Sequence, residues 1–260
     1  MSDVLRSPRV REAIIARLLC TDDVRQAVTG YAESIAEILG GELVSVYLYG
    51  SLARGCFHPR TSDVDVLVVS EGPCRDDALR RICLAHDQIR IPADAVFVTK
   101  GQIALDSTPT PVDFTIKPGL GARPIRSPEG SRDFLLVRQE VLDCDMALVG
   151  RPAREVMRPV PWPLLAQALD HLLPNILPHF KNPALMLCRV AYAFANRSLC
   201  SKQAAGDWAL AALAPRWHGM VGNALEKYRS GVADNQGPDE ELYAFERYCV
   251  DYIANVRERP

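Results

Sequence analysis

Two apolar runs early in the chain predict buried strands. Leu43–Tyr49 and Val64–Ser70 are nearly continuous apolar stretches with the length and composition of strands in a sheet. Ahead of them, Ser7–Leu19 and Asp22–Leu39 carry apolar residues at helical spacing, and Gly40-Gly41 predicts the end of the second helix. The pattern therefore predicts helices followed by the first strands of a sheet.

Helix and strand patterns alternate again further along. Arg75–Asp87 predicts a helix, and Ile91–Val98 predicts a third strand. The stretch Lys100–Arg132 is rich in Pro and Gly, which predicts a long loop or an irregular hairpin. Phe134–Val149 predicts a helix or a mixed segment that closes this first part of the chain.

A Pro-rich stretch over residues 150–163 marks a change in the pattern, which is helical from there on. Five helices are predicted, at Leu164–Leu173, Pro183–Phe194, Lys202–Leu213, Trp217–Tyr228 and Asp239–Ile253. A run of helices after an α/β segment indicates a separate all-α domain. We therefore expect an α/β domain with a small mixed sheet over residues 1–157 and a helical bundle over residues 158–260.

Composition excludes several classes of protein. The chain has 260 residues, 48% hydrophobic and 24% charged, which is ordinary for a globular protein. A net charge of −2 does not favour a nucleic-acid partner, and no apolar run reaches the roughly 18 residues of a membrane span. The polar N-terminus, Met1–Glu12, does not resemble a signal peptide. Eight Cys without Cys-x-x-Cys pairs indicate the cytoplasm, with neither disulfides nor zinc. We expect a monomer or dimer.

The residues around the first two predicted strands carry the candidate chemistry. Gly50-Ser51 directly follows one run, and Asp63 and Asp65 open the other. Alternate side chains of a strand share a face, so both carboxylates point the same way. Neighbouring carboxylates repel each other unless a cation lies between them, and Mg²⁺ suits such ligands. A Gly-Ser turn lets backbone N–H groups approach an anion. The alternative is a pair of solvent-facing Asp residues on an edge strand.

This combination of Gly-Ser, spacer and Asp-x-Asp between two strands resembles the nucleotidyltransferase superfamily typified by DNA polymerase β. The resemblance implies that Asp63 and Asp65 hold two Mg²⁺ ions. It implies that Gly50 and Ser51 hold the nucleotide triphosphate, and that Ser62 touches phosphate. The implied fold is a polymerase β-like domain.

The same resemblance implies a third carboxylate beside these two, on another strand. An Asp inside an apolar strand is costly to bury unless it has a function. Asp94 matches the third acidic residue of the superfamily, and the resemblance assigns it the role of general base. Asp113 also lies inside a short apolar run, Val112–Ile116, and remains the alternative third acid.

Three later stretches carry a narrower resemblance: Cys188–Tyr192, Lys202–Ala209 and Val141–Gly150. They look like the aminoglycoside nucleotidyltransferases that modify streptomycin and spectinomycin. The resemblance implies transfer of AMP from ATP to a hydroxyl of a small cationic antibiotic, giving resistance. A carboxylate at Asp207 suits this use, because it attracts an ammonium group by charge-assisted hydrogen bonds. The alternative for Asp207 is an interaction with the dipole of its own helix. Trp208 is expected in the core.

Other basic and aromatic residues receive roles from the resemblance. Lys227 or Arg229 is expected to reach the triphosphate, and Tyr248 is expected to line the nucleotide. The loop ahead of Ser62 contains His58 and Arg60, which lie either in solvent or near phosphate.

The chain departs from that family at specific positions. Gln203, one helical turn before Asp207, stands where the family commonly has an Asp, although we still expect it to contact the acceptor. The segment Pro111–Lys117 has no Trp, and Asp94 replaces the usual Glu. The part of the site that binds the antibiotic is therefore expected to carry less negative charge than in the family. This difference favours spectinomycin over streptomycin as the substrate.

Three alternatives remain from the sequence. The chain either modifies another small molecule, acts on a protein partner as in toxin–antitoxin systems, or binds nucleotide without catalysis. A fused helical bundle disfavours the second of these, and intact Asp63, Asp65 and Asp94 disfavour the third.

Overall fold

The chain forms two compact units in a computed structural model that describes residues 18–119, 122–232 and 237–258. The first unit contains the residues up to Phe57 together with Ser62–Leu164. The second unit contains the short segment His58–Thr61 together with the residues from Leu165 onward. The predicted domain boundary lay after residue 157, so the first compact unit extends a few residues beyond it.

One mixed sheet, built from the described residues, organises the first unit. Its strands are β1 (Leu43–Tyr49), β2 (Val64–Ser70), β3 (Ala93–Thr99), β4 (Phe114–Ile116), β5 (Pro124–Ile125) and β6 (Met146–Gly150). Their order across the sheet is β5-β4-β3-β2-β1-β6. The β2–β3 pair is parallel, and the other neighbouring strands are antiparallel. The parallel pair brings the starts of β2 and β3 to one edge of the sheet.

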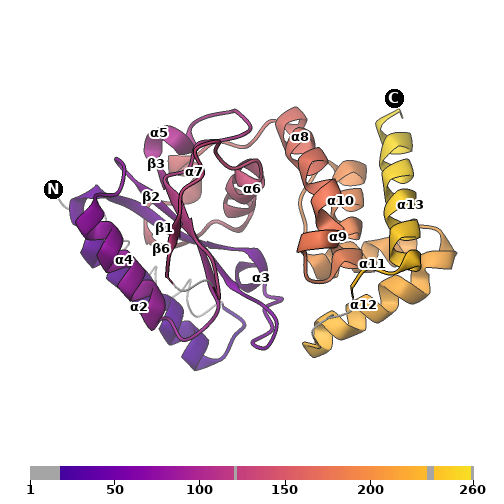
Figure 1. The fold of residues 1–260 in the computed structure, drawn as a ribbon, viewed down its shortest axis with the longest axis horizontal. Coiled ribbons are helices and arrows are strands. Elements are labelled where there is room, and N and C mark those ends of the chain that lie inside the picture. The colour runs from indigo at the N-terminus through magenta and orange to yellow at the C-terminus, as the bar shows by residue number, and fades with distance from the viewer. Residues whose placement is uncertain (1–17, 120–121, 233–236, 259–260) are drawn as a thin grey trace. The chain divides into compact units, whose positions relative to one another are not determined.

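Helices cover both faces of this sheet (Figure 1). Alternate strand residues such as Val46, Val66 and Ala95 face α2 (Asp22–Leu39) and α4 (Asp76–Gln88). The intervening residues face the other helices, which are α5 (Lys100–Ile103), α6 (Phe134–Cys144) and α7 (Ala153–Val156). The central strands are therefore buried on both sides, which explains why they appear in the sequence as continuous apolar runs.

The second unit is a helical bundle. Its helices are α8 (Trp162–Leu172), which begins in the first unit, α9 (Ile176–His179), α10 (Pro183–Asn196), α11 (Lys202–Ala212), α12 (His218–Ser230) and α13 (Glu240–Arg257). Helix α10 is central, because it is buried along most of its length and contacts α11, α12 and α13. Within the described residues, none of the helices combines the length and the apolar character that crossing a membrane requires.

Several predicted elements have the expected bounds, and others differ. Helix α2 and strands β1 and β2 match the predicted ranges. The region Lys100–Arg132 contains α5 and the short antiparallel pair β4–β5, which matches the irregular hairpin of the two predicted alternatives. Phe134–Val149 is the mixed segment of its two alternatives, with α6 followed by β6. The predicted helix Ser7–Leu19 lies almost entirely outside the described residues, and Leu18 and Leu19 at its end are not helical.

Candidate active site

Gly50 brings the backbone close to a carboxylate at the end of β1. It has a positive φ of 67° and begins a single helical turn, α3 (Gly50–Ala53). A Cβ atom at this position would lie 1.9 Å from Oδ2 of Asp65 and 2.7 Å from its Cγ. Any side chain here would displace Asp65 or the turn. The Gly that the sequence singled out is therefore required by both conformation and space.

Asp65 and Asp94 lie side by side at one edge of the sheet. The two residues are partners in the parallel β2–β3 register, and Tyr49 is the partner of Asp65 on β1. Neighbouring strands are about 4.8 Å apart, so the two carboxylates are close enough to share a cation. Asp63 precedes β2 by one residue and has the same strand parity as Asp65. All three acids thus belong to the sheet face that packs against α6.

Asp94 has an asymmetric environment. Its Oδ2 pairs with Nζ of Lys117, while its Oδ1 is buried without a hydrogen-bond partner. Burial, and then the negative charges of Asp65 and Asp94, raise the pKa of the Tyr49 phenol well above its usual value. The site is therefore electronegative and holds an unsatisfied acceptor, and both properties favour a bound cation or a donor hydroxyl.

The donor set fits Mg²⁺ rather than a metal held by protein alone. The described residues contain no preformed group of three or more His, Cys, Asp or Glu side chains arranged to hold a metal. Mg²⁺ commonly takes one or two carboxylates and completes its coordination with substrate phosphates and water. The carboxylates of Asp63 and Asp65, with the unpartnered acceptor on Asp94, match that requirement.

Asp113, the alternative third acid, lies at the other end of the β3–β4 pair. Strand β4 pairs antiparallel to β3, with Phe114 opposite Phe97. The Asp113 carboxylate accepts a hydrogen bond from the backbone N–H of Cys74 at 2.7 Å, and it is almost completely buried. Asp113 thus stabilises the loop that contains Cys74, whereas Asp94 is the acid beside Asp65.

In the helical unit, Asp207 pairs with a basic residue that the sequence had assigned to nucleotide. Nη2 of Arg229 donates to both carboxylate oxygens of Asp207, at 2.6 and 2.8 Å. Both side chains remain about half exposed, at 48% each. Gln203 lies one turn earlier on α11 and is partly buried. The proposed acceptor carboxylate therefore has a cationic partner within its own unit.

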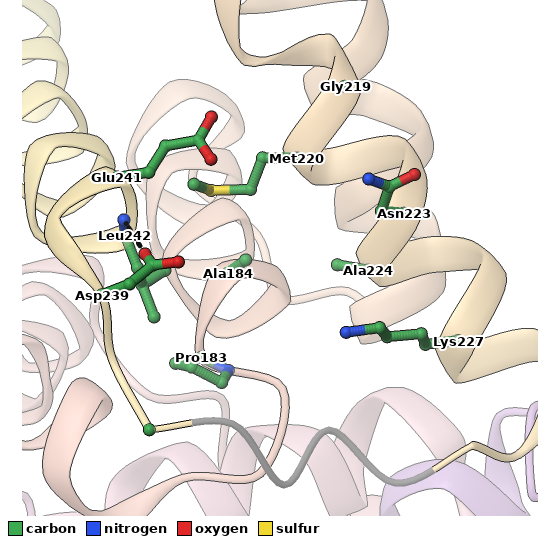
Figure 2. Close-up of a pocket in the computed structure, with 11 residues that line it drawn as sticks. Pro183, Ala184, Gly219, Met220, Asn223, Ala224, Lys227, Asp239, Glu241 and Leu242 are labelled. Atoms are coloured by element: carbon green, nitrogen blue, oxygen red, sulfur yellow. Dashed lines mark hydrogen bonds between the residues drawn. The ribbon is translucent and has the colours of Figure 1, made fainter.

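Lys227 lines a pocket of about 350 Å³ in the helical unit. Figure 2 shows its side chain on α12 near Asn223, across from Pro183 and Ala184 at the start of α10. The start of α13 contributes acidic residues to the rim, among them Glu241. The pocket combines a cation, an amide and small apolar residues, which is a lining that suits a polar small molecule.

Tyr248 belongs to an aromatic cluster on α13. Its hydroxyl accepts a hydrogen bond from the backbone N–H of Ala214 at 3.0 Å. Its ring packs against Trp217, Phe245 and Tyr252. Tyr252 also makes an edge contact with Trp208, which is half-buried rather than fully in the core as expected. The hydroxyl of Tyr248 therefore already accepts one hydrogen bond within the helical unit and can still donate its own proton.

Three features of the site were not found from the sequence. Lys117 lies in a Pro- and Gly-rich stretch where a single Lys has no distinguishing pattern. The Asp207–Arg229 pair joins two helices whose relative register the sequence does not specify. Arg60 donates to the backbone carbonyl of Ser230 at 2.5 Å, so it contacts the end of α12 within the helical unit.

The predicted residues thus form two groups. Gly50, Ser51, Ser62 and the acids Asp63, Asp65 and Asp94 lie in the first unit; Gln203, Asp207, Lys227, Arg229 and Tyr248 lie in the second.

Comparison with known proteins gives two family matches. The nucleotidyltransferase domain family matches residues 30–113, and the aminoglycoside adenylyltransferase C-terminal domain family matches residues 155–252. The first match lies mostly in the first unit, and the second match lies mostly in the second unit.

Curated relatives match most of the chain. A spectinomycin 9-adenylyltransferase of Campylobacter jejuni is 21% identical over 241 residues, covering 86% of this chain and 93% of the relative. An aminoglycoside (3'') (9) adenylyltransferase of Escherichia coli is 27% identical over 277 residues, covering 95% of this chain and 99% of the relative. The similarity therefore extends through both units.

A solved structure shares the fold. The spectinomycin adenyltransferase of Enterococcus faecialis, determined with ATP and spectinomycin, superposes with a TM-score of 0.73 at 14% identity. The match covers 88% of this chain and 98% of that one. A mixed sheet with helices followed by a helical domain is thus common to both proteins.

Proposed function

Because this chain belongs to the aminoglycoside adenylyltransferases of the polymerase β-like nucleotidyltransferase superfamily, we propose that it transfers AMP from ATP to a hydroxyl of a compact aminocyclitol such as spectinomycin. Such a modification gives resistance to the antibiotic. The observation that carries the proposal is the position of Asp65 and Asp94, side by side on β2 and β3 with the Gly50 backbone against Asp65.

The proposed reaction needs a base and an in-line leaving group. The acceptor hydroxyl gives its proton to the carboxylate of Asp94, and its oxygen attacks the α-phosphorus of ATP. The bond between the α-phosphorus and the bridging oxygen breaks, and pyrophosphate leaves with that oxygen. The buried, unpartnered Oδ1 of Asp94 supports this assignment, because it is an acceptor that no protein donor occupies.

Asp63 and Asp65 are the proposed ligands of two Mg²⁺ ions. When bound, these ions neutralise charge on the triphosphate and on the attacking and leaving oxygens. The carboxylate pair supports the assignment, and so does Gly50, whose backbone approaches the Asp65 carboxylate more closely than any residue with a Cβ could.

Nucleotide contacts are proposed in both units. Gly50 and Ser51 approach the β- and γ-phosphates through backbone N–H groups, and Ser62 contributes its hydroxyl. Lys227 provides a cation for phosphate at its pocket, and the Tyr248 ring lines the nucleotide. Arg229 was also expected to bind phosphate, but it pairs with Asp207 instead. We therefore do not include it among the proposed nucleotide contacts.

Asp207 and Gln203 are the proposed acceptor contacts. Asp207 attracts an acceptor ammonium, and the neutral Gln203 adds hydrogen bonds without a second charge. One fewer anion disfavours the guanidinium groups of streptomycin relative to the secondary amines of spectinomycin. The C. jejuni and Staphylococcus aureus relatives, named as spectinomycin 9-adenylyltransferases, support spectinomycin as an acceptor, while the E. coli relative is named for both the 3'' and the 9 position.

Pyrophosphate release from purified protein with ATP, Mg²⁺ and a panel of aminoglycosides and aminocyclitols tests the function. We expect release with spectinomycin and none after chelation of Mg²⁺. Release with no member of the panel would contradict the proposed acceptor class. Stoichiometric co-purification of a small protein would instead favour a protein substrate.

A further inference from the structure

Helices α11 and α12 are packed closely beside Asp207. A Cβ atom at Gly206 would lie 2.6 Å from Cδ2 of Leu225, so a larger residue here would force Leu225 to move. Asp207 follows Gly206 on α11, and Arg229 follows Leu225 by one helical turn on α12. The contact between the two helices therefore places the two charged residues opposite each other, where they pair.

The Asp207 carboxylate is engaged but accessible. Both of its oxygens accept from one Arg229 nitrogen, so the internal cation occupies the position that an acceptor ammonium would take. With about half of each side chain exposed, a solute can reach the pair. Exposed ion pairs contribute little to stability, so a competing cation can displace Arg229 without unfolding the bundle.

We propose that Arg229 is a specificity-determining residue, which competes with the acceptor for Asp207 and so selects acceptors that carry few positive charges. The inference rests on the proposed function, in which Asp207 faces the acceptor. Arg229 opposes a highly cationic acceptor in two ways: it neutralises the carboxylate, and its displaced guanidinium repels further positive charge nearby.

The first unit contains a parallel arrangement. Lys117 pairs with Oδ2 of Asp94, so the proposed base also has an internal cation and only Oδ1 remains unpartnered. Two acids proposed to act on the acceptor, Asp94 and Asp207, are thus balanced by Lys117 and Arg229, each pair within its own unit. Neutralised acids suit an acceptor of low charge.

Calorimetric titration of the full chain tests the inference, with spectinomycin or streptomycin added in the presence of a non-hydrolysable ATP analogue. We expect Arg229→Gln to strengthen streptomycin binding relative to spectinomycin by about twofold to fivefold, the range for one exposed charge contact. In separate turnover assays of the same variant, the KM for ATP should remain unchanged. Arg229→Lys retains the positive charge and should stay close to the wild-type ratio.

Two further variants separate a specific effect from loss of charge. Arg257 forms a comparable exposed pair with Asp170, at 45% exposure for each side chain, so Arg257→Gln should leave the drug ratio unchanged. In an Asp207→Asn background, Arg229→Gln should no longer alter the ratio, because the two residues act through one contact.

If Arg229→Gln left the ratio of streptomycin to spectinomycin affinity unchanged, the role of Arg229 would be overturned while the proposed function would stand. A raised KM for ATP would overturn that role as well, because it would assign Arg229 to phosphate. Failure of the wild-type protein to bind either drug would overturn the proposed function and this inference together.

Discussion

Gly50 shows how a single residue without a side chain determines the site. Its backbone occupies the space beside Asp65 that any Cβ would fill, and its φ is positive. The sequence identified this Gly and the Asp-x-Asp pair, because strand parity and turn chemistry are local properties. It did not identify the partners Lys117 and Arg229, because ion pairs between distant segments depend on packing that local patterns do not encode.

Replacing Gly50 should therefore disrupt the site. We expect Gly50→Ala to lower kcat by about 100-fold, the scale of a small misplacement in an active site. Backbone strain should also lower stability by roughly 1–3 kcal/mol. Gly72→Ala is the matched control, because a Cβ there meets nothing within 4 Å. Turnover and thermal melting of both variants measure the difference, and equal behaviour would contradict the close approach to Asp65.

The two candidate bases should differ when each is made an amide. Asp94→Asn should lower kcat by about 10²- to 10⁴-fold while binding of an ATP analogue persists, since it removes the general base. Asp113→Asn should retain turnover and lose stability by about 1 kcal/mol, because it weakens the hydrogen bond from Cys74. The opposite assignment of effects would transfer the base to Asp113.

The order of helices and strands was predictable wherever the apolar residues of an element recurred with helical or strand spacing. Strands β4, β5 and β6 were not predicted as separate strands. The first two are very short and lie among Pro and Gly, and β6 follows α6 after one residue in the left-handed conformation, Asp145. Such strands are stabilised by pairing with neighbours already in the sheet, which their own sequences do not reveal.

The packing of α2 against α4 has a pH-sensitive contact. Nδ1 of His86 lies 3.1 Å from the hydroxyl of Tyr31, and both residues are buried. Burial lowers the pKa of His86, opposed by a backbone hydrogen bond at Ala93 and by the charges of Asp87 and Asp94. The neutral imidazole is therefore favoured in the folded protein.

Stability should consequently fall in mild acid. Below the ordinary value of 6.5 the unfolded chain binds a proton that the folded protein does not, so the free energy of unfolding decreases as the pH falls. The slope for one proton is at most about 1.4 kcal/mol per pH unit, and the loss ends below the folded pKa. In thermal melts from pH 7.5 downward, His86→Gln should show a shallower decline than wild type. Identical declines would exclude His86 as the source.

For the whole molecule, the division into units does not follow the order of the chain. The segment His58–Thr61 lies between the Gly-Ser turn and Asp63 in sequence, yet it belongs to the helical unit. Arg60 bonds the carbonyl of Ser230, and the His58 ring fills the space where Gly231 would carry a Cβ. Sequence patterns gave a boundary near residue 157 but no indication of this segment.

Arg60→Ala should therefore loosen the end of α12. We expect faster hydrogen exchange at Val232, whose N–H bonds the carbonyl of Lys227, with no change at the amides of β1 and β2. Arg75→Ala, at an exposed Arg of the first unit, is the control. Exchange that stays equal at Val232 in both variants would show that the Arg60 contact does not hold this end of the helix.

The segment His58–Thr61 also affects how such a gene recombines. A crossover at the boundary near residue 164 would inherit α12 from one parent and the segment that packs against Gly231 from the other. Chimeras joined there would carry a mismatch at His58 even when each parental half is intact. Functional hybrids should therefore arise when residues 58–61 are exchanged along with the C-terminal half, a requirement that a linear map of domains would not suggest.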